Sequence, residues 1–204
     1  MLLLPWQQTT YADAGVVADK NNPAVSIVVL GDSISAGYGI QRSDGWVSLL
    51  EHRMLALNAN SQVINASVSG ETTSGGLARL TQLLETHEPD LVVIELGGND
   101  GLRGYPVTRI RENLAAMVEL CRINKISPII FGMRIPPNYG PRYTTAFHTL
   151  FKEVADATNT PLVPFFLESV ATESTLMQSD GIHPNSEAQE TLLENAWNVL
   201  QSLL

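Results

Sequence analysis

Short apolar runs alternate with longer amphipathic stretches from residue 25 to the end of the chain. The runs are rich in Val, Ile and Leu, as is typical of strands that are buried on both faces of a parallel sheet. They predict five strands, at residues 25–30, 62–66, 91–95, 128–131 and 161–163.

Between the predicted strands, apolar residues recur every three or four positions, which is the period of a helix with one buried face. These stretches predict five helices, at residues 46–57, 74–87, 107–124, 147–154 and 186–204. Asn185-Ser186 supplies a capping signal for the last helix. Because strands and helices alternate and no repeat or linker divides the chain, we expect one three-layer α/β/α domain around a mostly parallel sheet.

The first 23 residues lie outside this pattern. The apolar segment at residues 1–6 is too short to span a bilayer, and no apolar run of transmembrane length occurs elsewhere, so we do not expect integral membrane association. Ala12-Asp13-Ala14 fits the small-x-small pattern of a signal-peptidase site, but the positively charged region of an export signal is missing. Two interpretations of residues 1–23 stay open, the remnant of an export signal and a frayed arm. Both place the domain at residues 24–204.

Composition and charge exclude some classes of function. The chain has 204 residues, of which 44% are apolar and 16% charged, so a full hydrophobic core can form without a metal or a disulfide. The formal charge is −9. It is unevenly distributed along the chain, because all 12 Lys and Arg residues lie at or before Lys152 and eight carboxylates follow it. An acidic chain with scattered basic residues lacks the electrostatic footprint of a nucleic-acid-binding protein, so we expect no nucleic acid partner.

The chain has one cysteine, Cys121, which excludes an intramolecular disulfide and a cysteine-built zinc site. Cys121 continues the helical spacing of the apolar residues before it, so we interpret it as a core residue. His52, His87 and His148 lie in or beside predicted helices without partners at ligand spacing, and we interpret them as structural or surface residues. The glycine-rich segments of the chain lack the complete motif of a dinucleotide-binding loop or a phosphate-binding loop. We therefore expect no metal and no cofactor.

In open parallel sheets the working site lies beyond the carboxyl ends of the strands. The first predicted strand is followed by Gly31-Asp32-Ser33, where glycine allows a sharp turn that exposes the Ser33 hydroxyl. Gly70 follows the second strand and Asn99 the third. The N–H groups of Ser33 and Gly70 and the side-chain amide of Asn99 are candidates for an oxyanion hole. Taken singly, each motif is more typical of a turn or a helix cap.

The segment Asp180-Gly181-Ile182-His183-Pro184 stands just before the last predicted helix. A carboxylate three residues before a histidine can accept a hydrogen bond from Nδ1–H and leave Nε2 directed at a hydroxyl, which is the arrangement of a general base and its orienting partner. Ser33, Asp180 and His183 are therefore the candidate catalytic residues.

The motifs together resemble those of the SGNH (GDSL) hydrolase superfamily, whose four sequence blocks carry a catalytic Ser, an oxyanion-hole Gly, an oxyanion-hole Asn and a D-x-x-H pair. All four blocks are present, as Ser33, Gly70, Asn99, and Asp180 with His183. Longer strings at residues 98–104 and 132–143 are similar to those of the bacterial thioesterase I, lysophospholipase and arylesterase subgroup.

The resemblance implies a flavodoxin-like fold with a five-stranded parallel sheet in the order 2-1-3-4-5. It also implies a serine hydrolase that cleaves acyl esters, and in some members thioesters, without a cofactor. It favours export to the periplasm, with a cytoplasmic location as the alternative. The expected partner is a small or lipid-like acyl ester, and we expect a monomer.

The substrate is less well defined by the sequence. Loops after the third and fourth predicted strands carry residues that could wall an acyl groove: Tyr105, Pro106, Met133, Ile135, Pro136, Pro137 and Tyr139. Arg103, Arg134 and Arg142 in the same loops are candidates for contact with a phosphate-bearing leaving group, or for internal pairing. Two alternative functions stay open: a carbohydrate O-deacetylase or acetylesterase of the same superfamily, and a non-catalytic flavodoxin-like binding module.

Overall fold

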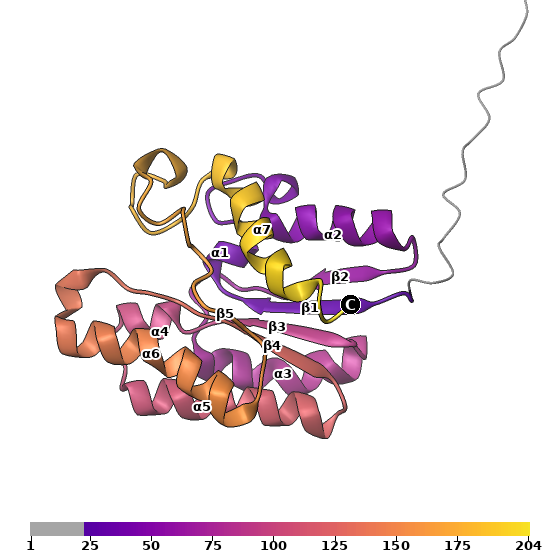
Figure 1. Ribbon diagram of the computed structural model, residues 1–204, viewed down its shortest axis with the longest axis horizontal. Coiled ribbons are helices and arrows are strands. Elements are labelled where there is room, and N and C mark those ends of the chain that lie inside the picture. The colour runs from indigo at the N-terminus through magenta and orange to yellow at the C-terminus, as the bar shows by residue number, and fades with distance from the viewer. Residues whose placement is uncertain (1–22) are drawn as a thin grey trace, which may run out of the picture.

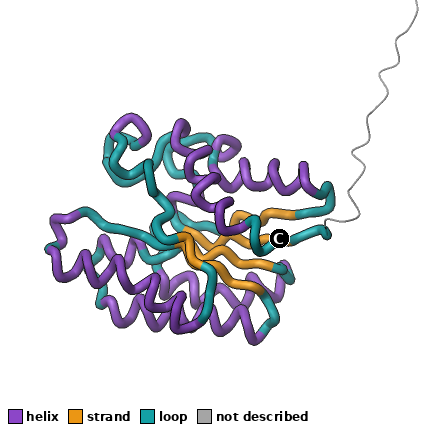
Figure 2. Tube along the Cα trace, viewed as in Figure 1, coloured by secondary structure: helices purple, strands orange, loops and turns teal. Residues whose placement is uncertain are grey.

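Five parallel strands form one sheet between two layers of helices in the computed structural model, which describes residues 23–204 (Figure 1, Figure 2). The strands are β1 (Ser26–Gly31), β2 (Gln62–Asn65), β3 (Leu91–Glu95), β4 (Ser127–Phe131) and β5 (Leu162–Val163). Every neighbouring pair is parallel, and the spatial order is β2-β1-β3-β4-β5. The predicted three-layer fold and sheet order are confirmed.

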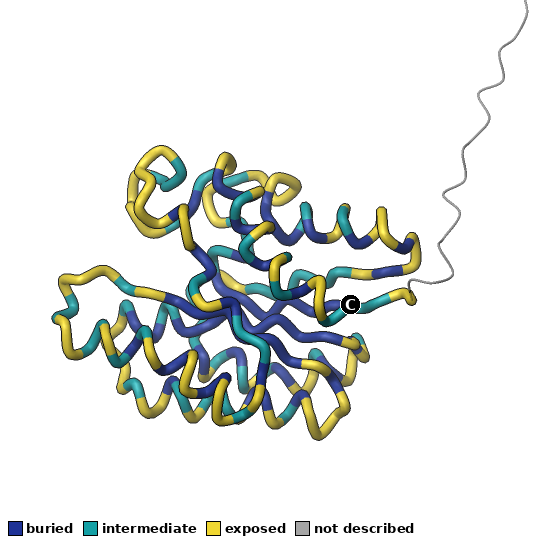
Figure 3. Tube along the Cα trace, viewed as in Figure 1, coloured by how far each residue is buried: buried dark blue, intermediate teal, exposed yellow. Residues whose placement is uncertain are grey.

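The central strands, β1 and β3, are buried on both faces, as the dark blue of Figure 3 shows. Residues 27–30 and 92–94 have no exposed surface, which explains why both strands consist almost entirely of Val, Ile and Leu. Gly31 at the end of β1 lies opposite Glu95 at the end of β3. The loops that follow these two strands therefore start side by side at one edge of the sheet.

Five longer helices cover the sheet. They are α2 (Trp46–Leu57), α3 (Thr73–His87), α5 (Val107–Ile123), α6 (Pro141–Thr158) and α7 (Gln189–Leu200). Figure 1 shows α2 and α7 on one face and α3, α5 and α6 on the other. Shorter elements lie between them: α1 (Ser33–Ala36), α4 (Gly98–Leu102), and the 3₁₀ turns at Arg42–Asp44, Pro137–Tyr139, Ser174–Leu176 and Ser186–Ala188.

Two of the helices, α6 and α7, differ from the predicted boundaries by more than one residue. α6 begins at Pro141 rather than at residue 147, because proline suits the first turn of a helix and its polar first residues hide the start from an apolar pattern. The predicted helix at residues 186–204 is a 3₁₀ turn followed by α7, which ends at Leu200. Neither α1 nor α4 was predicted, since helices this short show no periodicity.

The core contains an aromatic cluster between the sheet and α2. The rings of Trp46, Phe131 and Phe166 lie with their centroids 4.8–5.7 Å apart. On the opposite face, Cys121 of α5 has no exposed surface, and burial raises the pKa of its thiol to about 12. The interpretation of Cys121 as a core residue is confirmed.

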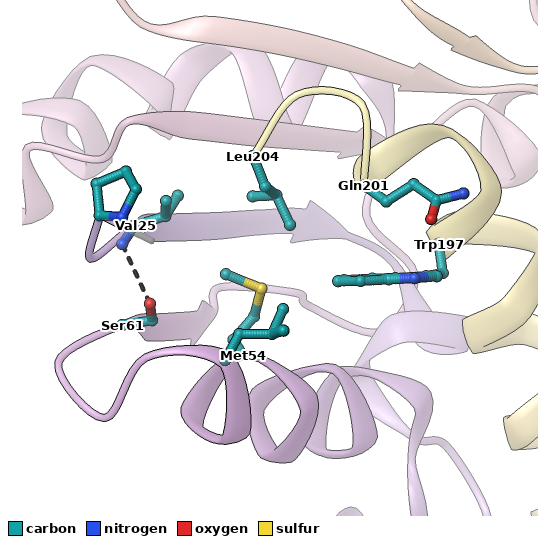
Figure 4. A pocket seen from close by; sticks show the side chains of 8 residues that line it. Val25, Met54, Ser61, Trp197, Gln201 and Leu204 are labelled. Carbon is teal, nitrogen blue, oxygen red and sulfur yellow. Dashed lines mark hydrogen bonds between the residues drawn. The ribbon is translucent and has the colours of Figure 1, made fainter. Parts of the chain in front are cut away.

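A cavity of about 230 Å³ lies at the edge where the strands begin, between α2 and the end of α7 (Figure 4). It is lined by Pro23, Val25, Met54, Leu57, Ser61, Trp197, Gln201 and Leu204. The Ser61 hydroxyl oxygen accepts a hydrogen bond from the Val25 N–H at 3.2 Å. Leu204 brings the C-terminus beside the start of β1.

The signal-peptidase motif at residues 12–14 lies outside the described residues, as does almost all of the predicted arm at residues 1–23. Among residues 23–204, no helix is both long and apolar enough to cross a membrane.

Candidate active site

Ser33 lies at the sharp turn between β1 and α1. Asp32 caps the helix, because its Oδ1 accepts a hydrogen bond from the Ile34 N–H at 3.0 Å. A Cβ atom at position 31 would lie 2.6 Å from Glu95 Oε2 and 2.7 Å from Ser35 Cβ, so only glycine allows the strand to pass this close. The turn thus directs the Ser33 hydroxyl outward at the carboxyl edge of the sheet.

His183 bridges Ser33 and Asp180. Its Nε2 lies 2.9 Å from Ser33 Oγ, and its Nδ1 lies 2.6 Å from Asp180 Oδ2. Hydrogen bonds from the His183 ring, then from the N–H groups of His183 and Ile182, lower the pKa of Asp180 to about 2. An ionised Asp180 only accepts, so the neutral imidazole carries its proton on Nδ1 and offers Nε2 to the Ser33 hydroxyl.

The loop that carries His183 is anchored by Gln178, which sequence analysis missed. Gln178 Nε2 donates to the carbonyl oxygens of Tyr38 at 2.7 Å and Pro184 at 3.0 Å, and Gln178 N–H donates to the His183 carbonyl at 2.8 Å. Tyr38 also places its ring 4.5 Å from the His183 ring. A single glutamine in a polar loop belongs to no motif or period, so nothing in the sequence pointed to it.

Three candidate N–H donors follow the carboxyl ends of β1, β2 and β3. The backbone N–H groups of Ser33 and Gly70 make no hydrogen bond within residues 23–204. Gly70 has φ +79°, a conformation that favours glycine, and its carbonyl accepts from Arg103 Nη2 at 3.1 Å. Asn99, in the first turn of α4, donates from Nδ2 to Asp32 Oδ2 at 3.0 Å. All the predicted catalytic and oxyanion-hole residues therefore lie at one edge of the sheet.

Two buried carboxyl groups, Asp32 and Glu95, lie directly beneath the turn. Burial raises the pKa of Asp32 to about 6, although hydrogen bonds from Ile34 and Asn99 oppose the shift. Glu95 has no exposed surface, and burial and the charge of Asp32 raise its pKa well above the usual value. Its Oε2 accepts from the Asp32 N–H and the Ser35 hydroxyl, while its buried Oε1 has no partner in the described chain. A carboxylate that ends an apolar strand is the sequence signal that could have identified Glu95.

The residues expected to wall an acyl groove separate into two groups. Tyr139 lines a cavity of about 360 Å³ with Gly140, Pro141, Arg142, Tyr143 and Ala146. Tyr105 and Pro106 are exposed nearby, and the Tyr105 carbonyl accepts from the Tyr143 hydroxyl at 2.6 Å. Met133, by contrast, is a core residue with 2% of its surface exposed, and Ile135 is half-buried against the core.

Two of the three loop arginines have internal partners. Arg103 donates to the Gly70 carbonyl, and the guanidinium of Arg134 lies 4.4 Å from the centre of the Phe165 ring. Arg142 lines the cavity beside Tyr139. Among residues 23–204, no group of three or more His, Cys, Asp or Glu residues is placed to hold a metal ion.

Comparison with protein-family models matches residues 29–191 to the GDSL-like lipase/acylhydrolase family. The chain belongs to this family. The match includes Ser33, Gly70, Asn99 and the Asp180–His183 pair.

Individual relatives agree with the family match. Esterase TesA of Pseudomonas aeruginosa is 48% identical over 93% of this chain and 94% of its own. The thioesterase 1/protease 1/lysophospholipase L1 of Escherichia coli K12 is 40% identical over 89% of this chain and 86% of its own. A crystal structure of TesA superposes with a TM-score of 0.84 at 50% identity, covering 88% of this chain and 99% of that one.

Proposed function

We propose that this protein hydrolyses carboxylic esters through an acyl-enzyme intermediate on Ser33. The activity agrees with the acylhydrolase family and with relatives named as an esterase and a thioesterase/lysophospholipase. One observation carries the residue assignment: the His183 ring lies within hydrogen-bond distance of both the Ser33 hydroxyl and the Asp180 carboxylate. A binding module has no use for this arrangement.

In the first half of the reaction, Ser33 Oγ bonds to the acyl carbon while His183 Nε2 takes the hydroxyl proton. The carbonyl electrons move onto oxygen, and the N–H groups of Ser33, Gly70 and Asn99 stabilise that oxyanion. When the intermediate collapses, the bond to the leaving oxygen breaks, and His183 returns its proton to the departing alcohol. Asp180 holds the imidazole in the correct tautomer and stabilises its charged form.

Water then repeats the sequence on the acyl-enzyme. His183 takes a proton from water, the hydroxide oxygen bonds to the acyl carbon, and the Ser33 ester bond breaks as Oγ is reprotonated. The acid is released, and the enzyme returns to its starting state. No step requires a metal or an organic cofactor.

The cavity beside α4 favours acyl groups larger than acetyl. The Tyr139 hydroxyl donates to the Leu102 carbonyl at 2.7 Å and so holds this partly aromatic cavity against the helix that carries Asn99. Its volume of about 360 Å³ is within the range of small-molecule sites. We expect kcat/KM for p-nitrophenyl esters to rise from acetate to hexanoate. A preference for acetate, together with cleavage of acetylated sugars, would favour the O-deacetylase alternative.

Replacement of Ser33 tests the assignment. Ser33→Ala should lower esterase turnover by roughly 10⁴-fold or more and abolish labelling by a fluorophosphonate probe. Ser43→Ala is the matched control, because Ser43 is an exposed serine in a neighbouring turn, and it should keep both activity and labelling. Wild-type turnover by Ser33→Ala, or a label found on another residue, would refute the assignment.

We also propose that the protein is exported to the periplasm and acts as a monomer, with residues 1–23 outside the catalytic domain. Ala12-Asp13-Ala14 and the resemblance to an exported subgroup support export. N-terminal sequencing of the protein from a periplasmic fraction should find a chain that starts at Gly15. An intact N-terminus in the cytoplasmic fraction would contradict export, and light scattering tests the monomer.

A further inference from the structure

Asn99 can stabilise an oxyanion only if its amide is turned the right way. An asparagine side chain presents an NH₂ group on one side and a carbonyl oxygen on the other, and a 180° rotation exchanges them. The NH₂ group stabilises a developing oxyanion, whereas the carbonyl oxygen repels it. Some neighbouring group must therefore fix the orientation.

We propose that Asp32 is the positioning residue that orients the Asn99 amide and so completes the oxyanion hole, an inference that rests on the proposed function. Asp32 Oδ2 accepts from Asn99 Nδ2 at 3.0 Å, while Oδ1 is occupied by the Ile34 N–H. In the flipped amide, Asn99 Oδ1 would face the Asp32 carboxylate, oxygen against oxygen. In the observed orientation, the second N–H of Asn99 has no acceptor within residues 23–204 and is free for substrate.

Asp32 is itself held rigidly from below. Glu95 Oε2 accepts from the Asp32 N–H at 3.2 Å and from the Ser35 hydroxyl at 2.6 Å, and Ser35 Oγ accepts from Trp46 Nε1 at 3.1 Å. Glu95 and Asn99 lie at the two ends of the short connection between β3 and α4. Asp32 is therefore hydrogen-bonded to both ends of this connection. Its backbone N–H bonds to Glu95, and its side chain bonds to Asn99.

The surrounding charges agree with this role. Three ionisable groups face Asp32: Glu95 beneath it, Asp100 on α4, and His183 on the C-terminal loop. Asp100 is already engaged by two hydrogen bonds from the start of α3. Burial raises the pKa of both carboxyl groups, and the hydrogen bonds that Asp32 accepts from Ile34 and Asn99 favour its ionised form. An ionised Asp32 has no proton to offer and can only accept from Asn99.

A double-mutant cycle tests the proposal. Asp32→Asn keeps an oxygen for the Ile34 N–H but turns an NH₂ group toward Asn99 Nδ2, donor against donor. We expect kcat for p-nitrophenyl butyrate to fall by about 10²–10³-fold, as for Asn99→Ala, with little change in KM. If Asp32 acts through Asn99, then Asp32→Asn should lower kcat by no more than about twofold further in the Asn99→Ala background. If Asp32 has only a structural role, the fold decreases in kcat of the two single variants should multiply in the double variant.

Two further variants keep the test decisive. Asp32→Ser also retains an acceptor for Ile34 and cannot reach Asn99, so it should behave as Asp32→Asn and replaces it if that variant fails to fold. Asp100→Asn is the matched control, because Asp100 is a neighbouring buried carboxylate that makes no hydrogen bond to Asn99, and its effect should multiply with that of Asn99→Ala.

The outcomes separate this inference from the proposed function. Asp32 variants with kcat near wild type, or effects that multiply with Asn99→Ala, would overturn the positioning role while Ser33→Ala still establishes the esterase. If Asn99→Ala itself keeps wild-type kcat, then Asn99 is not an oxyanion donor and the inference is lost with that assignment.

Discussion

Tyr38 lies against the ring of His183, with the centroids 4.5 Å apart and the planes tilted by 39°. During turnover His183 becomes an imidazolium, and an aromatic face beside an exposed cation stabilises it by about 0.5–1 kcal/mol. We expect Tyr38→Ala to lower kcat by about two- to fivefold and Tyr38→Phe, which keeps the ring, to retain it. Steady-state kinetics on p-nitrophenyl butyrate measure both. Equal kcat for all three proteins would show that the ring contact has no catalytic effect.

The buried Asp32 makes stability depend on pH. Because its pKa rises from 3.8 to about 6 on folding, the folded state binds this proton more tightly than the unfolded state. The stabilisation that protonated Asp32 gives the folded state is present below pH 4 and is lost as pH rises through 6. Two pKa units correspond to about 3 kcal/mol, so between pH 4 and 7 the unfolding free energy of Asp32→Asn should rise relative to wild type by up to about that amount. Urea denaturation at the two pH values measures the difference.

Asn99→Ala is the control for this measurement. It loses the same hydrogen bond but keeps the carboxyl group, so its stability relative to wild type should fall, not rise, over the same pH range. If the difference in unfolding free energy between Asp32→Asn and wild type does not change with pH, then Asp32 titrates in the folded protein as it does in the unfolded chain.

At the residue scale, the sequence predicts the groups that form local motifs. Ser33, Asp180 and His183 are recognisable because each stands among turn residues at a strand end or before a helix. Glu95 and Gln178 act through hydrogen bonds that include partners 60 and 140 residues away in the sequence. Such pairings are created by the fold and have no fixed sequence spacing, so the only local signal is the position of Glu95 at the end of an apolar strand.

At the scale of elements, α4 is held by a close contact with α6. A Cβ atom at Gly101 would lie 2.6 Å from the Phe147 ring and 2.8 Å from Ile135 Cγ2. We expect Gly101→Ala to lower the unfolding free energy by about 1–3 kcal/mol, because the added methyl overpacks this contact. It should also lower kcat, since α4 carries Asn99. Thermal unfolding and esterase kinetics on one preparation measure both.

Gly104→Ala provides the comparison. Gly104 lies just beyond α4 with φ +67°, and a methyl group there meets no atom within 4 Å. It should cost about 1–2 kcal/mol of backbone strain and leave kcat unchanged. Loss of kcat in both variants would show that the effect is not specific to packing against α6.

Elements were predictable where burial imposes a period. β1 and β3 are buried on both faces and therefore consist of unbroken apolar residues, and α3 and α5 each bury one face. α1 and α4 depend instead on glycines with positive φ beside them, Gly37 at the end of α1 and Gly97 before α4. Those short helices position Ser33 and Asn99, so the part of the fold closest to the chemistry was the hardest to predict.

On the scale of the whole molecule, charge is unevenly distributed along the chain. The lysine- and arginine-free C-terminal quarter contains the end of α6, β5, the loop that carries His183, and α7. We expect this acidic segment, which includes His183, to repel highly anionic substrates, so kcat/KM for butyryl-CoA should be lower than for p-nitrophenyl butyrate at low salt. The two values should converge as salt shortens the Debye length from about 30 Å at 0.01 M to about 10 Å at 0.1 M. A ratio that favours butyryl-CoA at low salt would refute this expectation.

The burial of Cys121 has a practical consequence. It is the chain's single thiol, it has no exposed surface in α5, and its raised pKa keeps it protonated. Alkylating reagents attack thiolates, so they reach Cys121 only when the surrounding structure opens. The rate at which Cys121 is alkylated therefore measures how often the surrounding structure opens. A cysteine introduced on the surface would be the one position at which a fluorophore or spin label attaches to the native protein.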